Sequence, residues 1–319
     1  MSSTGRQHVT HMIDISAPAD IVYRVVADAA AWPRRFAPTV HVEESNLDDS
    51  TQRLRIWAYA GGGVKTWTSR RALDSAGRRV SFRQEVSTPP VASMGGEWIA
   101  AAAAGGTRLT LHHDFEAVGD DPDGIAWITG VTDQNSQSEL ASIKALAERW
   151  DQLNELEFTF ESSLLINSPP EAVYGFLYQA GEWPRRLPHV SRLELREEVE
   201  NIQLMSMDTR TKDGRVHTTE SVRVCFPAQR ITYKQISAPA LVAAHTGEWI
   251  VEKTDDGVLA TSRHAVTVNE AAISGVLGAE ATVESAKDFL RTAIGGNSET
   301  TLGLAKAFAE AAHDEAAHD

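Results

Sequence analysis

The chain has 319 residues, enough for two domains that each bury an apolar core. Its formal net charge of −14 argues against a general nucleic-acid binder and against an anionic membrane surface as the main partner, since both interactions need a basic face. The single cysteine, Cys225, excludes an intramolecular disulfide and a cysteine-rich zinc site. With no signal-like N-terminal segment and no long apolar stretch, we expect a cytoplasmic protein.

In chain order, the first half predicts a strand, a helix, several strands and a long helix. Residues 9–15 alternate between apolar and polar side chains, which indicates a strand. We expect the following helix to be capped by Ser16 and to end at Trp32-Pro33. Five further alternating segments are separated by glycine-rich or polar turns, so they predict hairpins. They are residues 53–59, 65–73, 80–86, 97–101 and 107–115.

The second half repeats the first half after 151 residues. Trp32-Pro33-Arg34-Arg35 returns as Trp183-Pro184-Arg185-Arg186, and Gly96-Glu97-Trp98 returns as Gly247-Glu248-Trp249. A repeat this long indicates a duplicated domain, because solenoid units recur every 20 to 50 residues or so. We expect domains at 1–152 and 157–319 with a polar linker at 151–157.

Each copy is expected to have an α+β fold. The strands follow one another as hairpins, so the sheet should be antiparallel. One face of that sheet must be covered, and the long helix that closes each copy is the candidate. We therefore predict two tandem helix-grip domains, each a curved antiparallel sheet wrapped around a long C-terminal helix with an internal cavity.

A Ser-x-Arg pattern lies on one predicted strand of each copy. Side chains alternate along a strand, so Ser69 and Arg71 share a face, as do Ser221 and Arg223. If this face points inward, each arginine enters the interior, where it must be paired or must await an anion. If it points outward, each arginine meets a surface carboxylate.

A histidine recurs on the last strand of each copy. His113 shares a face with Leu109, Leu111 and Phe115, and His264 is its counterpart. An inward histidine can act as an acid or base near neutral pH, or it can be a core residue bonded to a backbone carbonyl. No His/Asp/Glu spacing resembles a metal site, so we expect no metal and no other cofactor.

Asparagine and tryptophan residues complete the candidate set. Asn135 and Asn297 are expected to open the two long helices, either as caps or at the rim of a cavity. Tryptophans are typical of cores, but they also line pockets for flat ligands. The recurring ones are Trp32, Trp67, Trp98, Trp183 and Trp249.

Taken together and in order, these motifs resemble the polyketide aromatase/cyclases of the helix-grip superfamily, which also contains START and Bet v 1 proteins. The resemblance covers nearly the whole chain once per copy, so it is to the di-domain subclass of bacterial type II polyketide synthases. It implies that a poly-β-ketone on an acyl carrier protein is closed into its first ring by aldol condensation, usually between C7 and C12, and aromatised by dehydration.

The same resemblance assigns the site residues and the partners. It implies a cavity lined by the serine and arginine of each Ser-x-Arg pattern, the tryptophans and the helix asparagines, with the two strand histidines also involved. At the position of Trp67 the second copy has Thr219, so its walls differ. The implied partners are the acyl carrier protein and other synthase subunits, with no nucleic acid and no membrane.

Two alternatives stay open. The chain could be a non-catalytic START-like binding protein for a hydrophobic or polyketide ligand, because that function also needs a cavity. One copy could also be an inactive scaffold that docks the carrier protein.

Overall fold

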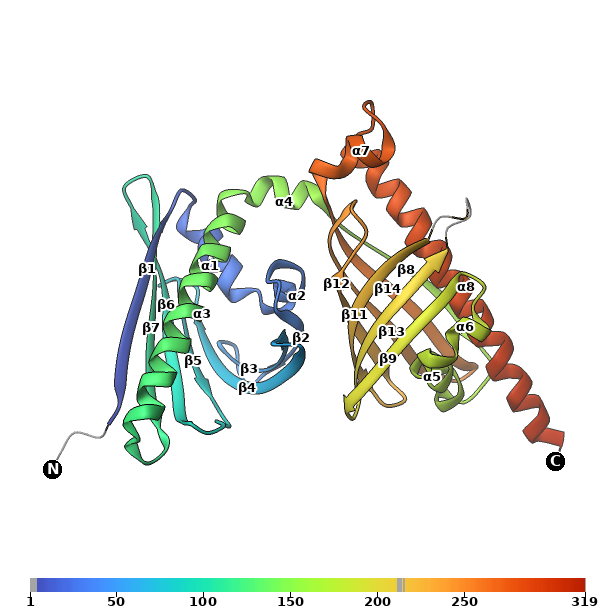
Figure 1. The fold of residues 1–319 in the computed structure, drawn as a ribbon, viewed down its shortest axis with the longest axis horizontal. Helices are drawn as coiled ribbons and strands as arrows, with labels where there is room; N and C mark the ends of the chain where they lie inside the picture. The colour runs from blue at the N-terminus through green and yellow to red at the C-terminus, as the bar shows by residue number, and fades with distance from the viewer. Residues whose placement is uncertain (1–4, 211–213, 215, 319) are drawn as a thin grey trace. The chain divides into compact units, whose positions relative to one another are not determined.

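The computed structural model describes residues 5–210, 214 and 216–318, with side chains as far as residue 314. The chain divides into two compact units, residues 1–153 and 154–319 (Figure 1). Each unit contains one seven-stranded antiparallel sheet with helices packed against it. The sheets have matching strand orders, β1-β7-β6-β5-β4-β3-β2 and β8-β14-β13-β12-β11-β10-β9. The α+β helix-grip prediction is therefore confirmed.

The first unit follows the predicted order, with additions. Its elements are β1 Gln7–Ile15, α1 Ala19–Ala27, α2 Trp32–Arg35, β2 Thr39–Asn46, β3 Thr51–Ala60, β4 Gly63–Asp74, β5 Arg79–Gln84, β6 Val91–Ala103, β7 Gly106–Ala117 and α3 Pro122–Glu148. The helix α4, Trp150–Leu156, then leads towards the second unit. No described helix is long and apolar enough to cross a membrane.

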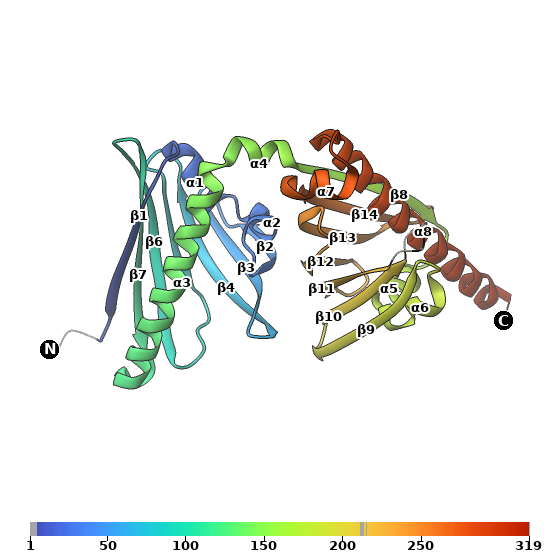
Figure 2. The same cartoon turned by 45° about the horizontal axis from the view of Figure 1, so that its top comes forward.

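The second unit repeats this series. Its elements are β8 Glu157–Ile166, α5 Pro170–Tyr178, α6 Trp183–Arg186, β9 Val190–Val199, β10 Ile202–Arg210, β11 Val216–Phe226, β12 Arg230–Ser237, β13 Val242–Thr254, β14 Gly257–Val268, α7 Ile273–Leu277 and α8 Val283–His318. In both views α3 and α8 run along the sheets of their own units (Figures 1 and 2).

Each unit has its own apolar core between the inner face of its sheet and its helices. In the first unit, Val22 and Val25 of α1 pack with Trp98 and with Leu140 of α3. The second core contains their counterparts, among them Val173, Trp249 and Leu302. The two cores are therefore built from matching positions of the repeat.

Glycine is required where the first strand of each unit meets the last. Gly106 and Gly257 begin β7 and β14 with φ angles of 152° and 124°. A Cβ on Gly106 would lie 2.1 Å from the Ile15 carbonyl oxygen, and one on Gly257 would lie 2.3 Å from that of Ile166. Only glycine has both the conformation and the small size that this close approach needs.

Several local predictions were wrong. Strands β2 and β9 were not predicted, and the expected polar linker is the helix α4, whose Leu156 is buried. Trp32-Pro33 begins α2, because proline fits the first turn of a helix where its missing N–H is not needed. Ser16 does not cap α1, whose N-cap is Pro18, and at the matching place in the second unit the N-cap of α5 is Pro169.

Candidate active site in each domain

Arg71 of β4 points to the inner face and joins the sheet to the end of α1. Its Nε and Nη2 donate to Gln52 Oε1 at 2.9 and 2.6 Å, and its Nη1 donates to the Val26 carbonyl at 3.5 Å. Nη2 also lies 3.3 Å from Glu44 Oε1, and the guanidinium stacks 5.5 Å from the Trp32 ring. Burial lowers the pKa of Arg71, and the nearby Glu44 carboxylate opposes that shift.

Arg223 of β11 repeats this arrangement with a fully buried side chain. Its Nη1 donates to Gln203 Oε1 at 2.7 Å, and its Nη2 donates to the Leu177 carbonyl at 2.6 Å. The Trp183 ring lies 5.3 Å away. The last carbonyls of a helix lack intrahelical donors and form the negative end of its dipole, so an arginine there stabilises the helix end. Both arginines face inward, and both are bound by protein groups.

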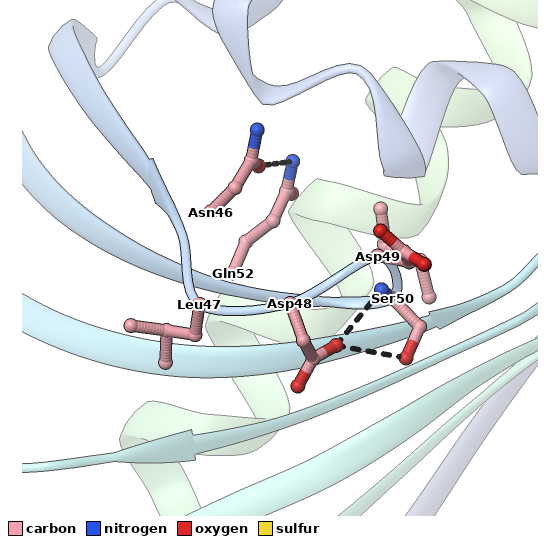
Figure 3. Close-up of a pocket in the computed structure, with 7 residues that line it drawn as sticks. Asn46, Leu47, Asp48, Asp49, Ser50 and Gln52 are labelled. Carbon is pink, nitrogen blue, oxygen red and sulfur yellow. Dashed lines mark hydrogen bonds between the residues drawn. The ribbon is translucent and has the colours of Figure 1, made fainter.

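A chain of hydrogen bonds runs from Arg71 through Gln52 to a surface pocket. Gln52 Nε2 donates to Asn46 Oδ1 at 3.1 Å, and both residues line a pocket of about 530 Å³ at the β2–β3 turn (Figure 3). In the same view Asp48 accepts hydrogen bonds from Ser50 and shapes the turn. None of the predicted site residues lines this pocket. A second pocket of about 460 Å³ has Arg71 and Phe82 among its lining residues.

The two Ser-x-Arg serines are buried. Ser69 is 6 % exposed and its hydroxyl donates to the Arg83 carbonyl at 3.2 Å, which ties β4 to β5. Ser221 is 3 % exposed on the matching strand. Of the two alternatives for the Ser-x-Arg face, the structure shows the inward one.

His113 lies on the inner face of β7 and is half-buried. Burial lowers its pKa to about 4, with a further lowering by His11 and a small opposing effect from Asp114. Its ring makes an edge contact with Phe82 at 5.5 Å between centroids. Its Nδ1 and the hydroxyl of Ser136 on α3 are both buried, and neither has a hydrogen-bond partner within the described part of the chain.

His264 lies in a polar cluster in the second domain. Its Nε2 lies 2.9 Å from Ser262 Oγ and 3.0 Å from Ser298 Oγ, and its Nδ1 lies 3.1 Å from both Tyr233 Oη and His245 Nε2. Burial lowers the pKa of His264 to about 4 and, together with His264, lowers the pKa of His245 to about 3. Both rings are therefore neutral at pH 7.

The predicted tryptophans lie in or against the apolar cores. Trp98 and Trp249 belong to the apolar cores, and the indole nitrogens of Trp32 and Trp183 donate to the carbonyls of Val25 and Phe176. Trp67 is half-buried against the cluster of Leu54 and Ile56, whereas Thr219 at its position is 3 % exposed.

The expected helix-opening role of the asparagines was wrong. Asn135 lies well inside α3, which begins at Pro122 behind an Asp121 cap, and it is exposed. Asn297 lies inside α8 and is half-buried, and its carbonyl accepts from Thr301 Oγ1 at 2.9 Å.

Glu139 is a candidate that the sequence did not reveal. It lies on α3 three, four and seven residues from the buried Ser136, Ile143 and Thr132, so it shares their sheet-facing side. Its side chain is nevertheless exposed, although desolvation by the surrounding protein raises its pKa to about 7. Thr301 holds this place in α8.

The family model for polyketide cyclase / dehydrase and lipid transport matches residues 6–148 and again residues 157–310. The chain belongs to this family.

Similar family members extend over both domains. The actinorhodin polyketide synthase bifunctional cyclase/dehydratase of Streptomyces coelicolor is 44% identical over 97% of this chain and 99% of its own. The granaticin polyketide synthase bifunctional cyclase/dehydratase of Streptomyces violaceoruber is 41% identical over 92% and 91%. With relatives of this kind along its whole length, this family member is a cyclase/dehydratase-type enzyme.

Solved family members have the same two-domain architecture. The di-domain ARO/CYC BexL from the BE-7585A biosynthetic pathway is 51% identical, with a TM-score of 0.87 over 95% of this chain and 99% of that one. The di-domain ARO/CYC StfQ from the steffimycin biosynthetic pathway is 33% identical, with a TM-score of 0.84 over 97% and 99%.

Proposed function

We propose that the chain closes the first ring of a poly-β-ketone carried by an acyl carrier protein, by aldol condensation between C7 and C12, and then aromatises that ring by dehydration. The supporting observation is the full-length similarity to bifunctional cyclase/dehydratases of polyketide synthases. The lone buried thiol of Cys225 fits action in a reducing cytoplasm.

The inward side chains suit this chemistry. Methylenes between two carbonyls are already acidic, so the reaction needs a held substrate, a weak base and donors for an enolate oxygen. His113 and His264 are neutral at pH 7, and a neutral imidazole can take or give a proton. Ser69 and Ser221 lie beside these interiors, and Trp67 contributes an apolar wall in the first domain.

We assign the arginines a positioning role within this function. The guanidinium groups of Arg71 and Arg223 donate to a glutamine and to a helix carbonyl, so they hold α1 and α5 over the inner face. The stacked Trp32 and Trp183 belong to the same clamps. In this proposal the arginines shape the pocket that selects which carbons meet.

Acyl carrier proteins are acidic, so the basic pairs Arg34-Arg35 and Arg185-Arg186 are candidate docking cations, and the structure supports them unevenly. Arg35 donates to Asp28 and covers Trp150, and Arg186 covers Phe308, so both have structural contacts. The Arg185 side chain is 79% exposed beside Glu182 and is the more available of these cations for an acidic carrier.

A ligand carrier of the same fold is the competing function. A carrier needs an apolar interior, but it has no need for inward groups that exchange protons. The polar cluster around His264 therefore favours catalysis over simple binding.

The test is reconstitution with a minimal polyketide synthase, with and without a ketoreductase. We expect the protein to redirect the carrier-bound chain to a C7–C12 aromatic product. His113→Gln should lower that product at least about tenfold, since acid–base groups contribute about 10²-fold or more. The matched control is His112→Gln, which changes the adjacent exposed histidine on the opposite face of β7.

An unchanged product profile on adding the protein would overturn the proposed function. Equal activity of the His112 and His113 variants would remove His113 from the mechanism and leave the function standing.

A further inference from the structure

Three residues of the polar cluster around His264 have apolar counterparts in the first domain. In the matching register, Tyr233, His245 and Ser262 replace Phe82, Met94 and Leu111, while His264 and Ser298 correspond to His113 and Ser136. Three apolar positions of one copy have therefore become three hydrogen-bonding positions of the other, all around the one retained histidine.

The cluster is buried except at Tyr233. His245, Ser262 and His264 are 3%, 1% and 2% exposed, whereas Tyr233 is half-buried. The Tyr233 ring lies against Gly247, where an added Cβ would come within 2.4 Å of the phenol oxygen. Glycine at this position lets the hydroxyl reach His264, and the phenol is the most exposed member of the cluster.

One nitrogen of the cluster, Nδ1 of His245, has no hydrogen-bond partner in the described part of the chain. A neutral imidazole has one N–H and one bare nitrogen. Because His245 Nε2 and His264 Nδ1 are 3.1 Å apart, one must donate to the other. Nδ1 of His245 is then either a bare acceptor or an N–H, and in both cases it is buried without a partner in the described part of the chain. An orphan atom of this kind points to a bound water or ligand oxygen.

We propose that Tyr233, His264 and His245 form a proton relay that serves water elimination, which places the dehydration step in the second domain. This proposal rests on the proposed function and assigns one of its two steps. The first domain, with Phe82, Met94 and Leu111 at the matching positions, is left with ring closure.

In this relay a cyclised β-hydroxy ketone loses water by a series of proton transfers. The α C–H bond breaks, its electron pair forms the C=C bond, and its proton reaches Nδ1 of His245 through a bound water. His245 passes the proton on its Nε2 to Nδ1 of His264, which passes a proton to the Tyr233 oxygen. Tyr233 gives its own proton to the substrate hydroxyl as the C–O bond breaks, and water leaves. Exchange with solvent restores the starting tautomer of His245.

The test replaces residues of the second domain by those at the matching positions of the first, Phe82 and Met94. In the reconstituted synthase, Tyr233→Phe and His245→Met are each expected to raise at least about tenfold the ratio of ring-closed product that retains its water to aromatic product. Mass spectrometry measures this ratio, and the position of ring closure should not change. Thr246→Val, on the next residue of β13 and the other face of the sheet, is the matched control.

A second readout separates a relay from a packing role. His245 acts through His264, so His245→Met should shift the imidazole ¹⁵N resonances of His264 in the folded protein, while Thr246→Val should not. Circular dichroism confirms folding, and Tyr233→Phe, which removes one oxygen atom, keeps the test valid if the His245 variant unfolds.

The outcomes distinguish the two proposals. If the unaltered protein closes no ring, the proposed function fails. If it closes and dehydrates the ring but the folded variants do so equally well, the relay fails and the function stands. Loss of ring closure in either variant would also overturn the assignment of dehydration alone to this domain.

Discussion

At the scale of single residues, the two buried arginines behave as clamps. Arg223 satisfies the Leu177 carbonyl at the end of α5 and the Gln203 amide oxygen, so its removal leaves two buried acceptors and a void. An unpaired buried polar group costs about 1–3 kcal/mol, and an empty side-chain volume adds to that cost.

We therefore expect Arg223→Ala to lower the free energy of unfolding by about 2–5 kcal/mol in denaturant titrations. Arg263→Ala is the control, because Arg263 lies on the surface beside Glu161 and such ion pairs contribute about 0–1 kcal/mol. Equal effects of the two substitutions would contradict the clamp.

The buried histidines predict how stability depends on pH. Burial lowers the folded pKa of His264 to about 4, whereas an unfolded histidine titrates near 6.5. Between these values the unfolded chain binds more protons, so stability is full above about pH 6.5 and is lost as the pH falls towards 4. His245, with a pKa of about 3, acts in the same direction.

Melting temperatures measured from pH 7 to pH 4.5 should therefore fall steeply, and His245→Met should reduce the slope. A slope identical to that of the unaltered protein would show that His245 is not held neutral by burial.

At the scale of elements, one residue controls the junction of the first and last strands. Gly257 has a φ of 124°, and a Cβ there would collide with the Ile166 carbonyl. We expect Gly257→Ala to cost about 1–3 kcal/mol, measured by chemical denaturation. Gly175→Ala is the control, because it lies in α5 with nothing within 4 Å of its added Cβ and helices favour alanine by about 1 kcal/mol. A neutral Gly257→Ala would contradict the need for a left-handed residue there.

Elements with a clean period were predictable from the sequence, and those without one were not. The alternation of β4 and β7 predicted which residues share a face with Arg71 and His113, and the structure shows that both faces point inward. Strand β9 escaped prediction because it is rich in charged side chains at exposed positions. The start of α3 was misplaced because its inward face includes Thr132, Ser136 and Glu139, and polar residues facing an interior obscure the apolar helical period.

At the scale of the whole molecule, the repeat predicted the two-domain architecture because it preserves the residues of both cores. It did not predict what the site residues bond to. Partners such as Gln52 for Arg71, or His245 for His264, come from other strands, and strand pairing between distant segments is set by the folded sheet and not by local pattern. Contacts of this kind become visible only in three dimensions.

The match between Gly96 under Phe82 and Gly247 under Tyr233 has a practical consequence. Both backbones already leave room for an aromatic ring at this place, so exchanging Phe82, Met94 and Leu111 for the residues of the other copy changes chemistry without changing the scaffold. The two domains therefore carry different inner side chains on the same backbone fold. The side chains of the second domain can guide the redesign of the matching positions in the first.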